Sequence, residues 1–544
     1  MDVDSRPEVM KSIVTFCILI SLALTPWYNV DSLVIPKLVL ILALASYLVP
    51  LVLISIKSSF KNKHFRYLYL VSFLFLIQLS IVFVVSDAPW EQQFFGRTGR
   101  GLGLLAYFSF IVILVATALS VNLRSIGLIG LGLTLSCGIS SLYCIFQYFG
   151  LDIFNWVTAT NGIIGTLGNP NFQSSFIAAS SVPILIYIWQ KKARMLILVP
   201  ISLILVGALY LCESTQGYIA LGISFFTFLL FYLYYKSKKL FIGLFFIFLG
   251  TGILIILGML NKGPFSNYLY KVSVQSRGEM WRSAFTGANA NPFFGVGLDS
   301  FGDWSLFYRD QQAARGIAEF TDNAHNIFLQ LAVTGGYLLT LMYFLVILLT
   351  LVSIFLVQKR LQKFDPMISA LVAAWISLQA QSIISPAGIP ILAWQFVISG
   401  AIIGLSQNME NYVTKLKSKS DIPNVFSFSL LIFSLFVSIP YVQSDALSMK
   451  SLNAGDAVLA IRAAKAYPES TVRYARIGGE LLKSNLPKES LEVGRAAVSF
   501  NPNAISGWIL ILANVEAPLP ERKKAKLEIL RLDPFNKIVA EFKL

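Results

Sequence analysis

The chain has 544 residues, of which 56% are hydrophobic and only 13% are charged. A soluble globular protein carries about 25% charged residues, so this composition excludes a soluble enzyme and indicates a polytopic membrane protein. The formal net charge is +15, but most lysines and arginines cluster in short loops between apolar segments. The positive-inside rule explains that charge better than nucleic-acid binding does.

Apolar segments of spanning length recur along most of the sequence and predict an all-α polytopic membrane protein with about 13 transmembrane helices. The first segment is interpreted as an uncleaved helix because no small-residue cleavage site follows it. The predicted segments are residues 12–27, 34–55, 67–86, 103–121, 125–149, 171–189, 195–212, 218–235, 240–260, 326–357, 366–386, 388–406 and 424–442.

Clusters of basic residues indicate how these helices are oriented. When the helices are counted off, every cluster falls on the same side of the membrane, which the positive-inside rule identifies as the cytoplasm. An odd number of helices then places the N-terminus inside and the C-terminus outside. The clusters lie in residues 57–66, 191–194, 236–239, 359–363 and 415–419.

The outer side is predicted to receive a long insert, about residues 261–325, which contains many aromatic residues. Loops of this length are usually functional or disordered, and the aromatic content argues against disorder. We therefore predict a polytopic membrane domain over residues 1–442, which includes this loop, and a second domain over residues 443–544.

The second domain shows a helical, repetitive pattern. Tyr467-Pro468, Asn501-Pro502 and Asp533-Pro534 recur at spacings of 34 and 32 residues. A period near 34 residues with helix-turn-helix character resembles tetratricopeptide (TPR) repeats. Such a domain would dock an envelope protein partner, or it would simply cap the membrane domain.

His325 is the leading candidate for chemistry. It is one of only two histidines in the chain, and it lies where the long polar insert meets an apolar helix. A histidine can exchange a proton near neutral pH. Asp322, Asn323 and Asn326 flank it and could orient the imidazole. The alternative is structural: Asp322 or Asn323 caps the helix, and His325 is an interfacial polar residue.

Cationic residues on the same outer side are candidates for phosphate binding. Arg97 and Arg100 lie among glycines beside the membrane surface, and arginine binds phosphate well, often through two hydrogen bonds. Arg277 and Trp281 are four residues apart and share one face of a predicted helix. Lys37 lies at the outer end of the second span. The alternative for these side chains is snorkelling toward lipid headgroups.

Short motifs accompany His325 and point to one family. They are Ala324-His325-Asn326 with Leu329-Gln330 and Gly335-Gly336, supported by Gly168-Asn169-Pro170-Asn171-Phe172, Arg277 with Trp281, Pro292 with Gly295 and Gly297, and Phe95-Gly96-Arg97. Over about residues 10–410 the chain resembles the O-antigen ligase / O-antigen polymerase superfamily of bacterial inner-membrane glycan transferases. The repeat-like tail occurs in many relatives.

The resemblance implies a glycosyltransferase of lipopolysaccharide or cell-envelope biosynthesis. Such an enzyme moves a glycan from undecaprenyl diphosphate to an acceptor hydroxyl, on lipid A-core or another glycan, at the periplasmic face, without metal or cofactor. It implies that His325 and Arg277 are catalytic, and that the C-terminal domain is periplasmic. The predicted substrate-binding residues are Arg97, Arg100, Lys37, Asn169, Asn171, Trp281 and Asn326.

Several alternatives stay open at this stage. A glycan polymerase or a protein O-oligosaccharyltransferase would carry the same motif, and His325 could act as a base or as a phosphate ligand. Ser214-Thr215-Gln216-Gly217 stands where many ligases have an arginine after the serine, which affects one phosphate contact. A solute transporter would instead show ionisable residues at mid-membrane depth and internal symmetry. A scaffold would act through the C-terminal repeats alone.

Overall fold

The computed structural model describes residues 6–152, 154, 156, 163–191, 195–310, 321–408 and 424–544. All the regular elements in these ranges are helices, which confirms the predicted all-α class. Two predicted basic clusters fall partly or wholly outside the description, through residues 192–194 and 415–419.

Every predicted span coincides with a helix of the main bundle. Ten helices of the described chain are long and apolar enough to cross a membrane, which makes this a multi-pass membrane protein. Helices α1, α5 and α8, with 17 residues each, lie at the remaining predicted spans, so the number of about 13 transmembrane helices stays a prediction. The bundle consists of α1 (Arg6–Leu22), α2 (Ile35–Ser59), α3 (Lys63–Val85), α5 (Leu104–Ser120), α6 (Ile126–Tyr148), α7 (Pro170–Gln190), α8 (Met195–Leu211), α9 (Thr215–Lys236), α10 (Lys238–Met259), α14 (Ile327–Leu361), α15 (Pro366–Ile384), α16 (Ile389–Asn408) and α17 (Asn424–Ala454).

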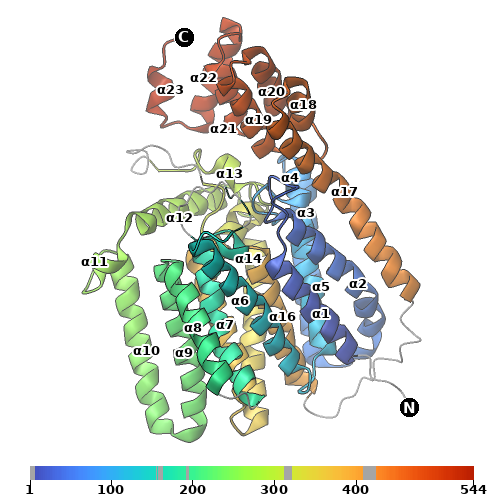
Figure 1. Cartoon of the computed structure of the whole chain (residues 1–544), viewed down its shortest axis with the longest axis vertical. Helices are drawn as coiled ribbons and strands as arrows, with labels where there is room; N and C mark the ends of the chain where they lie inside the picture. Colours follow the sequence, from blue (N-terminus) through green and yellow to red (C-terminus); the bar gives the residue numbers. More distant parts are fainter. Residues whose placement is uncertain are drawn as a thin grey trace.

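The bundle is organised around α16. Its apolar stretch is completely buried, whereas that of α10, at the edge of the bundle in Figure 1, contains no buried residue. Gly400 and Gly404 allow the close contact with α5, since a Cβ atom at either position would lie 2.4 Å or 2.3 Å from a carbonyl oxygen of that helix. Small residues four apart are the usual means of close helix packing in membranes.

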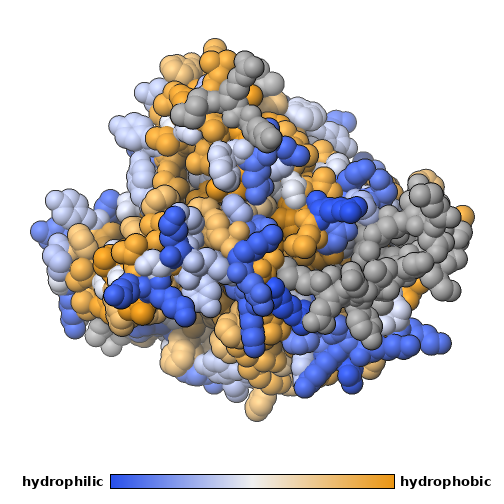
Figure 2. All heavy atoms as spheres, turned by 90° about the horizontal axis from the view of Figure 1, so that it is seen from below, coloured by the Kyte–Doolittle hydropathy of each residue, from blue (hydrophilic) through white to orange (hydrophobic). Residues whose placement is uncertain are grey.

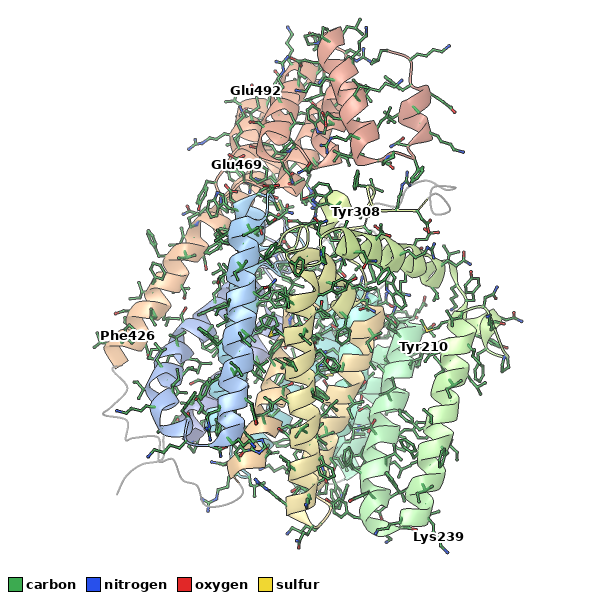
Figure 3. The ribbon with its side chains drawn as sticks, turned by 180° about the vertical axis from the view of Figure 1, so that it is seen from behind. Tyr210, Lys239, Tyr308, Phe426, Glu469 and Glu492 are labelled. Carbon is green, nitrogen blue, oxygen red and sulfur yellow. The ribbon has the colours of Figure 1, made fainter. Side chains whose placement is uncertain are left out.

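The two ends of the bundle differ in structure. One end carries α4 (Trp90–Phe95), the short helix η1 (Gly165–Leu167), α11 (Ser266–Leu269), α12 (Val272–Ala290) and α13 (Phe301–Trp304), and the C-terminal helices stand above it (Figure 1). The other end carries short turns such as the one at Lys239 (Figure 3). Seen from that end, hydrophilic side chains gather among hydrophobic ones (Figure 2). The short helices of the described loops therefore lie at one end of the bundle.

The C-terminal helices are α18 (Ala457–Ala464), α19 (Thr471–Lys483), α20 (Pro487–Phe500), α21 (Ile505–Ala513), α22 (Leu519–Leu532) and α23 (Lys537–Glu541). The predicted domain boundary at residue 443 lies inside α17, which continues to Ala454. The assignment of the tail as TPR-like remains a prediction.

The recurring dipeptides of the tail face the membrane domain. The ring of Tyr467 packs on Trp90 with centroids 5.9 Å apart. Asn501 Nδ2 donates to Asp303 Oδ2 at 3.0 Å. Asp533 pairs with Arg309 at 2.6 Å, and both side chains are buried. The first residue of each recurring dipeptide thus contacts the membrane domain, so the repeat in the sequence marks the contacts between the tail and the loop end of the bundle.

Candidate functional site

The segment before α14 is held by three side chains in succession. Asn326, not Asp322 or Asn323, caps the helix: its Oδ1 accepts from the N–H groups of Phe328 and Leu329 at 2.9 Å and 3.1 Å. Asn323 Oδ1 accepts instead from the N–H of His325 at 2.8 Å. The predicted capping role of Asp322 or Asn323 was wrong because the helix starts at Ile327, two residues after His325, which makes Asn326 the N-cap.

His325 is fixed in an unusual backbone conformation. Its φ is +52°, in the left-handed region that residues other than glycine rarely adopt and that is common at functional sites. Its carbonyl accepts from Trp281 Nε1 at 3.4 Å, so the predicted neighbour Trp281 contacts it. The ring atom Nδ1 is buried without a hydrogen-bond partner in the described structure. This backbone therefore presents an imidazole with an unused nitrogen.

The imidazole of His325 is neutral at neutral pH. Burial lowers its pKa to about 4, and the positive charges of Arg100 and Arg277 contribute in the same direction. The lone pair of the ring is therefore available to accept a proton, which is the protonation state that a general base requires.

Arg277 comes from α12 and lies near His325. Its side chain is buried, and its Nε has no hydrogen-bond partner. Burial lowers the pKa of the guanidinium, and in the described part of the chain no carboxylate forms an ion pair with it. A buried guanidinium without an anion is costly in isolation. The arrangement is suited to an anionic ligand.

Arg97 and Arg100 are bound to carboxylates of the long insert. Arg97 Nη1 donates to Asp303 Oδ1 at 2.6 Å, and both side chains are almost fully buried. Arg100 binds Asp322 through two hydrogen bonds, from Nε at 3.0 Å and from Nη2 at 2.6 Å. These carboxylates raise the pKa of both guanidinium groups despite the opposing effect of burial. The predicted phosphate ligands thus join the loop of residues 96–103 to the segment that carries His325.

Asp299 was not singled out from the sequence, although it organises this loop. Its Oδ2 accepts from the N–H groups of Arg97 at 2.7 Å and Leu102 at 3.1 Å. Burial raises its pKa to about 6. The only sequence signal was an acidic residue in the outer insert of a chain with few charges.

Glycines hold the insert against α14. The helix is interrupted at Gly336, where φ is +80°. A Cβ there would lie 2.3 Å from the backbone of Phe293, and one at Gly295 would lie 2.5 Å from the carbonyl oxygen of Val333. The freed carbonyl of Val333 accepts from the N–H of Val296 at 2.8 Å. The Gly335-Gly336 and Pro292–Gly297 motifs are therefore two sides of one backbone contact.

Lys37, Asn169 and Asn171 make hydrogen bonds of their own. Lys37 Nζ donates to the carbonyl of Thr166 at 2.5 Å. Asn169 caps α7, and Asn171 Oδ1 accepts from Ser214 Oγ at 2.7 Å. In the described part of the chain, no hydrogen bond or ion pair connects them to His325 or Arg277. The described hydrogen bonds of these three residues are thus distinct from those of the group around His325.

The described bundle and the His325 group define a polytopic membrane protein with a site in the loops at one end of the bundle. Residues 200–344 match the family model described as O-antigen ligase, a range that includes Arg277, Trp281 and His325. This match supports the O-antigen ligase superfamily, whose members are membrane glycosyltransferases of the ligase or polymerase type. No curated protein matches the chain.

Proposed function

We propose that the protein transfers a glycan from undecaprenyl diphosphate to an acceptor hydroxyl, on lipid A-core or another glycan, at the His325 site. The observation that carries this proposal is the pairing of two unused groups. His325 Nδ1 and Arg277 Nε are both buried without partners, inside the segment that matches the ligase family. One can accept a proton and the other can bind an anion.

In the proposed reaction, the neutral imidazole of His325 takes the proton of the acceptor hydroxyl. The oxygen attacks the anomeric carbon of the donor, and the bond from that carbon to the diphosphate oxygen breaks. Negative charge grows on the leaving diphosphate, where Arg277 stabilises it. Attack from the side opposite the leaving group inverts the configuration of that carbon.

Binding of the donor diphosphate would also change the pKa of His325. A diphosphate on Arg277 would offset the positive charge that lowers the pKa of His325, and a negative neighbour favours the charged form of imidazole. The pKa would then rise toward its ordinary value near 6.5. His325 would become a stronger base when the donor is present.

The other predicted residues have distinct roles in this proposal. Arg97 and Arg100, already bound to Asp303 and Asp322, hold the His325 segment in place, and the accessible edge of Arg100 could still meet the diphosphate. Trp281 and Asn326 fix the backbone on either side of His325. Lys37, Asn169 and Asn171 remain predicted contacts for another part of the substrate.

We place the loop end of the bundle in the periplasm of a bacterium, with the protein in the inner membrane. The basic turns at the opposite end support this orientation through the positive-inside rule. The C-terminal domain, which stands on the loop end (Figure 1), would then also be periplasmic.

The test is transfer by purified protein in liposomes that contain a polyprenyl-diphosphate glycan. His325→Ala should lower the rate by about 10²–10⁴-fold, the usual contribution of a general base. Arg282→Ala is a matched control, because Arg282 lies on the same helix as Arg277 but is exposed and paired with Asp310. Transfer by His325→Ala at the wild-type rate would refute the proposed chemistry. Separate reactions with lipid A-core, glycan and peptide acceptors identify the acceptor.

A further inference from the structure

A small hollow opens beside the site, between the end of α3 and the segment that follows α12. It measures about 320 Å³, at the lower end of the range for small-molecule sites. Tyr308, one of its lining residues, lies at the end of the bundle beneath the C-terminal helices (Figure 3). The lining residues are Val85, Ser86, Asp87, Ala88, Asn291, Pro292, Phe293, Phe294, Gly295, Val296, Trp304 and Tyr308.

The hollow combines aromatic faces with hydrogen-bonding groups. The rings of Trp304 and Tyr308 are 6.1 Å apart and inclined by 31°. Asn291 Nδ2 donates to the Tyr308 hydroxyl at 2.8 Å, which orients both polar groups. Asp87 is exposed, and its carboxylate has no partner in the described part of the chain. A ligand here would meet a flat apolar surface and several polar groups together.

A sugar ring has that combination of surfaces. Its C–H groups form an apolar face with slightly positive hydrogens, which suits the negative face of an indole or phenol ring. Its hydroxyls need donors and acceptors around the edge, as a carboxylate, an amide and a phenol provide. A second hollow, of about 620 Å³ between α2, α3 and α5, also has Arg66, Tyr69 and Ser72 in its lining, but the surface that it exposes is almost entirely apolar.

The hollow is built into the same backbone contact that supports His325. Gly295 and Val296 line it, and they pack against Val333 of α14. Gly297 brings the insert against Ser86 and Ala88, since a Cβ there would lie 2.3 Å from Ser86 Oγ. Val333 comes six residues after Ile327, the first residue of α14, which is about 9 Å along the helix axis, and His325 precedes Ile327 by two residues. A short oligosaccharide can reach from one to the other.

We propose that this hollow is a glycan-binding subsite that holds a sugar residue away from the reacting anomeric carbon. Trp304 is the stacking platform, and Asn291, Tyr308 and Asp87 bind hydroxyl groups. The inference rests on the proposed glycan transfer and adds to it a specificity-determining site. The bound sugar belongs either to the donor glycan or to the acceptor, and kinetics separates the two sources.

The experiment measures KM for donor and for acceptor in the liposome assay, with Trp304→Ala and Asn291→Ala. We expect KM for one of the two substrates to rise about tenfold, which corresponds to ~1.4 kcal/mol of lost binding. Trp304→Phe keeps an aromatic face and should recover most of the affinity. Phe307→Ala is the matched control, because Phe307 touches the same aromatic cluster but does not line the hollow.

A binding measurement separates this inference from the proposed reaction. Calorimetry with a phosphate-free oligosaccharide from the donor and from the acceptor should show weak binding that Trp304→Ala abolishes and His325→Ala leaves intact. Unchanged KM values and unchanged binding in Trp304→Ala would overturn the subsite, even if His325→Ala abolishes transfer. If wild type fails to transfer any glycan, the proposed function fails, and oligosaccharide binding at Trp304 is still tested on its own.

Discussion

The loop of residues 96–103 and helix α12 both bring arginine to the same end of the bundle, but in opposite states. Arg97 and Arg100 are matched to Asp303 and Asp322, whereas Arg277 is buried with an unpartnered Nε. Identical side chains thus serve different purposes. In the proposed function, the paired arginines stabilise the protein's own structure, and Arg277 keeps its binding capacity for a substrate. The predictions below test that distinction.

The largest effect is expected from Arg97→Ala. It leaves Asp303 buried without its cation, and breaking such a pair costs about 3–5 kcal/mol. Thermal unfolding in detergent should show a clearly lower midpoint. Arg282→Ala, which breaks an exposed pair, should cost at most ~1 kcal/mol. Equal midpoints for the two variants would remove the contrast between structural and exposed arginines.

Arg277→Ala is expected to lower activity without lowering stability, the reverse of Arg97→Ala. Transfer should fall about 10²–10³-fold, the loss seen when one donor that stabilises a developing anion is removed. The unfolding midpoint should stay at or above that of wild type, because the variant removes a buried charge that has no ion-pair partner in the described structure. Arg277→Lys keeps the charge but loses the planar fork, so it should recover only part of the rate. A marked loss of stability in Arg277→Ala would show that Arg277 is structural too.

The pKa of His325 depends first on burial, and the charges of Arg100 and Arg277 lower it further. The chain has two histidines, so His64→Gln leaves a single imidazole for NMR. We expect ligand-free protein to titrate at about 4 and Arg277→Ala to titrate higher, because a positive neighbour is gone. Since the pKa in the fold lies below the unfolded value near 6.5, the unfolded chain binds more protons between these values, and stability falls as pH decreases through that window. An unchanged pKa in Arg277→Ala would place the two groups too far apart to cooperate.

The smallest effect is expected at the contact between Asn501 of the tail and Asp303, the carboxylate that pairs with Arg97. Asn501→Ala removes one donor from Asp303, which still binds Arg97 and Gln92. We expect a loss of about 1 kcal/mol in thermal unfolding and a modest decrease in transfer. Asn503→Ala, two residues along the tail, should change neither. A complete loss of transfer in Asn501→Ala would mean that the tail takes part in the site itself.

The sequence allowed much of this architecture to be predicted, because apolar runs are a local signal. Each predicted span falls on a helix, and the four cysteines are buried and free, as expected for thiols within apolar segments. The interruption of α14 at Gly336 could not be predicted, since hydropathy continues across it. The His325 motif and Arg277 were identified through residue type and position beside the membrane.

The carboxylates of the site could not be predicted for a different reason. Asp303 lies 206 residues after Arg97, and Asp322 lies 222 residues after Arg100. No periodicity or short spacing connects residues so far apart, so both arginines were interpreted as free phosphate ligands. The same limit applied to the tail: its repeat was visible, but the contacts of Tyr467, Asn501 and Asp533 with the membrane domain depend on tertiary structure.

The interruption at Gly336 also sets how strictly the chain must keep its length. The insert contacts the helical segment from Ile327 to Gly335 at the C-terminal end of that segment. The number of residues between this contact and His325 therefore determines where the imidazole lies. One inserted or deleted residue would turn His325 by about 100° around the helix axis and shift it by about 1.5 Å. Such a change would carry the imidazole away from Arg277 and would also disturb the neighbouring pair of Asp322 and Arg100, while the contact of the insert with Gly336 stays in place. Between His325 and Gly336 the protein should tolerate substitutions far better than insertions or deletions.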